Sequence, residues 1–163
     1  MGNLSEHFNK EDLSCRCGQC RNDFRMSLTL IGILEDVRIK LNERVDIVCG
    51  FLCEDAEPRE AGPKKNYHNA GKAIDFTLTN KDRLVEAFRH LETFPEISGL
   101  GIDLVNKYIH IDLREKEPQK WIYVRGEQVE ITDSNRADHG LGEPVVKAQG
   151  YTSMSLELPV TID

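Results

Sequence analysis

Two segments of this chain alternate apolar and polar residues with a period of two, and this pattern limits the fold more than any other feature. In "KYIHIDLR" (107–114) the apolar face is built from isoleucines and a leucine. The opposite face of this strand consists of Tyr108, His110, Asp112 and Arg114. "KAIDFTL" (72–78) repeats the pattern, with Ala73 and Asp75 opposite an apolar face. A solvated sheet face would explain one such strand, whereas two strands with ligand-type residues favour a functional face.

The remaining pattern predicts helices and strands in the order α, β, β, α, β, β. Apolar residues recur at helical spacing over 27–42, and Asn80 is a typical N-cap before a second helix. The expected strands are 45–49, 72–78, 97–103 and 107–114, followed by a hairpin over 120–132 that turns at Arg125 and Gly126. These elements predict an α+β fold in which helices pack against a small antiparallel sheet.

The chain has 163 residues, which predicts one main domain over 1–131 and a C-terminal extension over 132–163. Near its end, alternate residues from Met154 to Ile162 are apolar, which predicts a strand with one apolar face. Pro159 confines such a strand to a sheet edge. The strand either closes the protein's own sheet or supports self-association or contact with a protein partner.

The formal net charge is −7, and no run of basic residues is present. We therefore expect neither nucleic acid nor a membrane surface as a partner. The N-terminus lacks the features of a secretory signal, and no apolar run has the length of a membrane span. The expected localisation is cytoplasmic at synthesis, with release by lysis or delivery to the cell wall for any action outside.

The five cysteines form two groups, "CRCGQC" (15–20) and "CGFLC" (49–53). Only Cys17 and Cys20 have the Cys-x-x-Cys spacing that is common in zinc sites. Three interpretations remain open: small buried residues beside one another, a bridge such as Cys17–Cys53, and a small metal clip.

His68, Asp75 and His110 together supply two imidazoles and one carboxylate. This is a common set of catalytic zinc ligands, with the fourth position left for water. Gly71 would let the chain turn from the loop of His68 into the strand of Asp75. The small side chain of Ala73, on the same face, would leave room for metal and substrate.

"NYHNAGKAID" (66–75) followed by "YIHIDLR" (108–114) resembles the motif of the zinc D-alanyl-D-alanine carboxypeptidases and L-alanyl-D-glutamate endopeptidases, which have a hedgehog-like fold. "LSEHFNKEDLSCRCGQC" and "VDIVCGFLC" are similar to further segments of the phage and bacterial branch of this family. The resemblance covers residues 4–124 and includes an aromatic residue at Trp121.

The resemblance implies a Zn²⁺-dependent peptidase or endolysin that cleaves the peptide stems of bacterial peptidoglycan. His68, Asp75 and His110 would hold the metal. The expected general base is Asp112 or Asp103, with Asp112 otherwise supporting the metal site or facing the substrate. The residues expected to contact the substrate are Asn66, Tyr108 and Arg114.

The chain departs from the family pattern at three positions. Asn66 replaces a serine, Leu52 replaces an arginine that helps to hold a substrate carboxylate, and Lys107 replaces an acidic general base. The last two departures support an alternative function from another class. The domain would then be a catalytically silent zinc-binding module that acts in binding or assembly.

Overall fold

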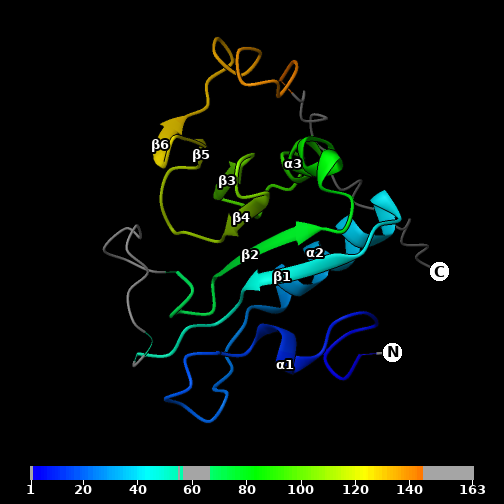
Figure 1. Ribbon diagram of the computed structural model, residues 1–163, viewed down its shortest axis with the longest axis vertical. Helices are drawn as coiled ribbons and strands as arrows, with labels where there is room; N and C mark the ends of the chain where they lie inside the picture. Colours follow the sequence, from blue (N-terminus) through cyan, green and yellow to red (C-terminus); the bar gives the residue numbers. More distant parts are fainter. Residues whose placement is uncertain (1, 55, 57–66, 145–163) are drawn as a thin grey trace, which may run out of the picture.

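The computed structural model describes residues 2–54, 56 and 67–144, which form one mixed sheet with helices (Figure 1). Its elements are α1 (Lys10–Leu13), α2 (Leu28–Leu41), β1 (Val45–Cys49), β2 (Ala73–Leu78), the 3₁₀ helix η1 (Lys81–Arg83), α3 (Leu84–Leu91), β3 (Gly99–Asp103), β4 (Tyr108–Asp112), β5 (Gln119–Val124) and β6 (Glu127–Glu130). The predicted α+β class is confirmed. No helix in this described part of the chain is long and apolar enough to cross a membrane.

The strands lie in the order β1-β2-β4-β3-β5-β6. All neighbouring pairs are antiparallel except β3 and β5, so the sheet is mixed rather than wholly antiparallel. The cause is topological. Because β2 already occupies the second edge of β4, the chain leaving β4 pairs with the free edge of β3 instead, and since it reverses direction after β4 it runs parallel to β3.

One face of the sheet is buried against α2 and α3, which also contact each other. Ile74 and Phe76 of β2 and Ile109 and Ile111 of β4 are all fully buried in this core. Burial of each such side chain contributes about 1.5–3 kcal/mol relative to exposure. The alternation in the sequence therefore fixes which face is the core and leaves the opposite face for polar groups.

The chain after β6 packs onto the same core. Leu141 is fully buried, and the buried Arg136 guanidinium forms two hydrogen bonds to the buried carboxylate of Glu92, at 2.8 and 2.7 Å. Glu92 also accepts a hydrogen bond from Lys120 at 2.7 Å. These contacts attach the segment beyond Ile131 to the end of α3.

The predicted strand from Met154 to Ile162 lies outside the described residues. Its pairing stays a prediction, as does the division of the chain into 1–131 and 132–163.

Candidate metal centre

The polar face of the sheet brings His68, Asp75 and His110 together. Asp75 on β2 and His110 on β4 are direct partners in the antiparallel register, and His110 Nδ1 lies 2.6 Å from Asp75 Oδ1. His68 lies in the turn before β2, and its Nε2 lies 3.4 Å from the same oxygen. Gly71 ends this turn with a φ of +67°, as its predicted role in the turn requires.

The outer nitrogen of each imidazole has its own partner. His68 Nδ1 lies 2.8 Å from the carbonyl oxygen of Gly50, which can only accept a hydrogen bond. His110 Nε2 lies 3.1 Å from Asp112 Oδ2. In their neutral forms, with these outer nitrogens as donors, the two rings would present the lone pairs of His68 Nε2 and His110 Nδ1 toward Asp75. The donor set and the tautomers therefore fit a bound metal cation.

The same contacts shift the pKa values of the three groups. Burial alone would lower the pKa of His68, but hydrogen bonds to Asp75 and Cys49 outweigh it and raise the pKa to about 10. The pKa of His110 is raised for a similar reason, because Asp112 and Asp75 outweigh burial. Burial would raise the pKa of Asp75, yet both histidines together hold it well below its usual range. The Asp75 carboxylate therefore favours positive charge at the two imidazoles.

Cys49 is a site residue that the sequence reasoning missed. Its sulfur and one ligand atom each of His68 and Asp75 lie within 4.8 Å of one another, a group that could hold a metal ion. The register of β1 shifts between Ile47 and Cys49, so that Cys49 rather than Val48 pairs with Asp75. Such a bulge adds one residue to the strand and redirects the next side chain. The sequence carries no clear signal of it.

Asp112 is fully buried and supports His110 from behind. Its carboxylate accepts hydrogen bonds from Arg114 Nε at 2.9 Å and from Arg114 Nη2 at 2.6 Å. Burial would raise the pKa of Asp112, but hydrogen bonds from Arg114 and His110 outweigh it and lower the pKa to about 2. Arg114 also donates to Gln119, so its guanidinium is fixed by protein groups. This places the predicted substrate contact Arg114 in a supporting position beside the site.

The other predicted site residues are Asp103, Tyr108 and Asn66. Asp103 ends β3, and its carboxylate accepts hydrogen bonds from the Val105 and Asn106 backbone and the Asn106 side chain, at 2.7–2.9 Å. It thus holds the turn before β4. Tyr108 shares the polar face and packs against the Tyr123 ring, with centroids 6.1 Å apart. Asn66 lies outside the described residues.

An aromatic wall borders the imidazole of His110. The Trp121 ring lies 5.4 Å from that of His110, and the Arg114 guanidinium lies 5.1 Å above the indole. Trp121 fits here because Gly101 on the neighbouring strand has no side chain, and a Cβ there would overlap the indole. The Trp121 Nε1 is buried and, within the described structure, has no hydrogen-bond partner.

A cleft of about 920 Å³ adjoins the metal centre at Cys49 and Gly50. Its walls come from the N-terminal segment 12–19 and from the chain around the end of β1. Leu52, at the position of the family arginine, lines this cleft, and Arg16 lines it from the N-terminal segment.

Comparison with known proteins agrees with this fold. The family description Peptidase M15 matches residues 6–112, a span that contains the three predicted metal ligands. The chain belongs to the M15 peptidase family, so it has the fold of a hydrolase that cleaves peptide bonds. No curated protein and no solved structure matches the chain.

Proposed function

We propose that this protein is a zinc-dependent peptidase that cleaves the peptide stems of bacterial peptidoglycan. The observation that carries the proposal is the convergence of His68 Nε2 and His110 Nδ1 on Asp75 Oδ1, with both outer nitrogens held by acceptors. Two imidazoles and a carboxylate are a typical catalytic zinc set. When bound, zinc polarises the peptide carbonyl and makes water acidic enough to act as a nucleophile near neutral pH.

The residues around the ligands hold them in position. Asp112 accepts from His110 Nε2 and so fixes the ring and its tautomer, an arrangement that strengthens metal ligation. Arg114 in turn holds Asp112 through hydrogen bonds from its backbone N–H, its Nε and its Nη2. Trp121 packs against the His110 ring, with ring centroids 5.4 Å apart, and so helps to hold that ring in position.

We do not propose Asp112 or Asp103 as the general base. A carboxylate with a pKa near 2, buried and paired with a guanidinium, is a weak proton acceptor at neutral pH. Both carboxylate oxygens of Asp103 accept hydrogen bonds from the turn between β3 and β4. The general-base role of Asp112 and Asp103 stays a prediction from the sequence. The geometry supports a role for Asp112 in positioning His110.

The adjoining cleft suggests how a substrate carboxylate could be held without the family arginine. Leu52 occupies that arginine's position, but Arg16 lines the same cleft from the opposite segment. Among the described residues that line the cleft, Arg16 is the one with a basic side chain. We therefore propose that Arg16 binds an acidic group of the peptide stem.

A second function is favoured by one observation, the position of Cys49. Cys49, His68 and Asp75 form a group that could hold a metal ion, and His110, which lies outside that group, would be a fourth protein ligand that closes the site, as in structural zinc centres. The domain would then be a silent zinc-binding module that acts in binding or assembly. The three-ligand site keeps a position for water and accounts for the family membership more directly.

The test is release of amino groups from purified peptidoglycan by the zinc-loaded protein. We expect release by the wild type and its loss in the His110→Ala variant, with product masses that identify the cleaved bond. A wild type that binds zinc stoichiometrically yet releases no amine from peptidoglycans of several stem compositions would overturn the peptidase proposal in favour of the silent module.

A further inference from the structure

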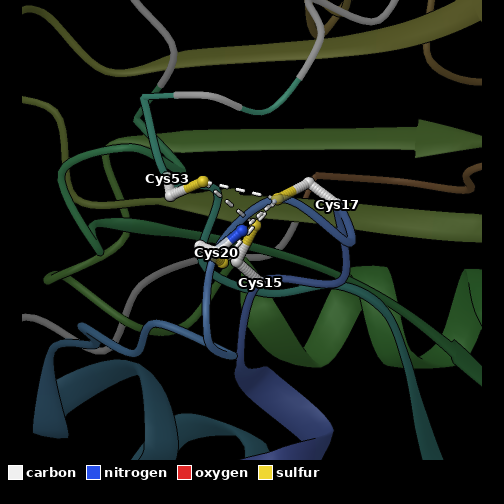
Figure 2. A group of neighbouring side chains, drawn as sticks. All are labelled: Cys15, Cys17, Cys20 and Cys53. Carbon is white, nitrogen blue, oxygen red and sulfur yellow. Dashed lines mark hydrogen bonds between the residues drawn. The ribbon is translucent and has the colours of Figure 1, made fainter.

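Four of the five cysteines form a separate cluster away from the His68–Asp75–His110 centre. Cys15, Cys17 and Cys20 come from the N-terminal segment and Cys53 from the loop after β1, and their side chains point toward one another (Figure 2). All four sulfurs lie within 4.8 Å of one another. Segments that are more than 30 residues apart in the sequence thus deliver four thiols to one point.

The spacing of the sulfurs distinguishes a metal site from disulfides. The distances are 3.6 Å for Cys15–Cys53, 3.5 Å for Cys17–Cys53 and 3.7 Å for Cys17–Cys20. A disulfide would need about 2.05 Å. Four sulfurs at the corners of a tetrahedron, each about 2.3 Å from a central zinc, are about 3.8 Å apart. The observed spacing is that of a tetrathiolate site, and none of the five cysteines, all within the described residues, forms a disulfide.

The backbone between Cys17 and Cys20 is also arranged for a charged sulfur. The N–H groups of Gln19 and Cys20 both donate to Cys17 Sγ, at 3.3 and 3.4 Å. Gly18 allows this tight turn with a φ of +77°, a conformation that other residues rarely adopt. Backbone donors directed at sulfur stabilise a thiolate, which is the form that binds metal. This is a second, independent feature of the cluster.

We propose that Cys15, Cys17, Cys20 and Cys53 bind one structural Zn²⁺, in addition to the metal at the histidine centre. Four thiolates leave no position for water, so this zinc would stabilise the fold rather than act in catalysis. Of the three interpretations that the sequence left open, the structure favours the metal clip.

The position of the cluster explains what such a clip would hold. It joins the N-terminal segment to the loop at 50–53, where the Phe51 N–H already donates to the Leu13 carbonyl at 2.8 Å. The same loop orients His68, because Gly50 accepts from His68 Nδ1 and the Leu52 N–H donates to the His68 carbonyl. Zinc at the cysteines would therefore fix the loop that positions one ligand of the other centre, and it would shape the cleft wall at Cys17.

The experiment removes the histidine centre, so that any metal that remains bound can be assigned to the cysteine cluster. In a His68→Ala variant of the full chain, purified under reducing conditions with zinc, elemental analysis should find one zinc per chain. Replacement of zinc by Co²⁺ in this variant should give the intense visible absorption of tetrahedral thiolate-bound cobalt. Adding Cys17→Ser should abolish the bound metal and this absorption. Adding Cys49→Ser instead, a cysteine outside the cluster, should leave both unchanged.

Three results would overturn the proposal. One is a His68→Ala protein that binds no metal and gives no thiolate–cobalt absorption, a reading that does not depend on the folding of any cysteine variant. Another is full retention of metal after Cys17→Ser. The third is fewer than five reactive thiols in the denatured, chelator-treated protein, which would show disulfides. None of these measurements uses peptidase activity, so a failure of the proposed function leaves them interpretable.

Discussion

Gly99 on β3 and Asp112 on β4 are direct partners in the sheet, and the carboxylate of Asp112 occupies the space where a Gly99 side chain would lie. This close approach lets a fully buried carboxylate reach behind the His110 ring. The alternating glycines of "GLG" (99–101) in β3 thus serve the polar face of the sheet, with Gly99 making room for Asp112 and Gly101 for Trp121.

The first prediction follows from this contact. Gly99→Ala should displace Asp112, destabilise the protein by about 1–3 kcal/mol through overpacking, and weaken metal binding at His110. Urea unfolding and zinc titration would measure both effects. Gly32→Ala is a suitable control, because this glycine lies inside α2 with open space around it. That variant should gain up to about 1 kcal/mol of stability from helix propensity. Unchanged metal affinity in Gly99→Ala would show that the position of Asp112 is unimportant.

The second prediction distinguishes two roles for Asp112. If Asp112 positions His110, Asp112→Asn should weaken zinc binding roughly 10–100-fold, as for other partners of ligating histidines. If it were the general base, zinc affinity should hold while turnover falls roughly 10²-fold or more. Zinc affinity measured by competition with a chelator, beside turnover at saturating zinc, separates these outcomes. Asp138→Asn, an exposed acid in the segment after β6, should change neither quantity.

Cys49 provides the third prediction, because its role decides whether the centre is open or closed. For an open, catalytic centre, Cys49→Ala should keep the zinc at the histidine centre, with turnover changed by less than about tenfold, or 1.4 kcal/mol. Elemental analysis and the peptidoglycan assay measure the two quantities. Loss of that zinc from the variant, together with an inactive wild type, would identify Cys49 as a fourth ligand.

Arg16 is the subject of the fourth prediction. A charge-assisted hydrogen bond to a substrate carboxylate is worth about 1.5–3 kcal/mol, so Arg16→Ala should lower kcat/KM roughly tenfold or more, mainly through KM. Arg44→Ala is the matched control, because Arg44 is exposed at the other end of β1 and pairs only with Asp46 among the described residues. Equal kinetics for Arg16→Ala and wild type would remove Arg16 from the substrate site.

The sequence predicted most elements and the grouping of His68, Asp75 and His110 at one place on the sheet, because both depend on local spacing. A period of two shows which strand residues share a face, and the ligands lie on β2, on β4 and in the short turn before β2. Cys49 could not be found this way, since a bulge in β1 reverses the face that regular alternation predicts. The sequence left three interpretations of the cysteines open, because their arrangement depends on how the N-terminal segment folds against the distant loop of Cys53. The parallel pairing of β5 with β3 likewise depends on which sheet edge is free.

The last prediction concerns stability in acid and depends on Glu92, which is buried between Arg136 and Lys120. Burial would raise its pKa, but the hydrogen bonds from both cations outweigh burial and lower the pKa below its usual value. A lowered folded-state pKa means that this interaction stabilises the protein above the unfolded-state pKa of about 4.3, and that the contribution is lost as the pH falls through the folded-state pKa.

Glu92→Gln should therefore destabilise the protein by about 3–5 kcal/mol at pH 7, because it leaves Arg136 buried without a counter-charge. The free energy of unfolding should be measured by urea denaturation from pH 7 down to pH 3. The difference between wild type and Glu92→Gln should be constant above about pH 5 and should shrink below about pH 4.3, where the carboxylate of the unfolded wild type begins to take up protons. Glu115→Gln, which removes an exposed partner of Lys72, should follow the wild-type curve closely. A difference that stays constant down to pH 3 would mean that the charge of Glu92 does not contribute to stability, and that the cost of the substitution comes from packing.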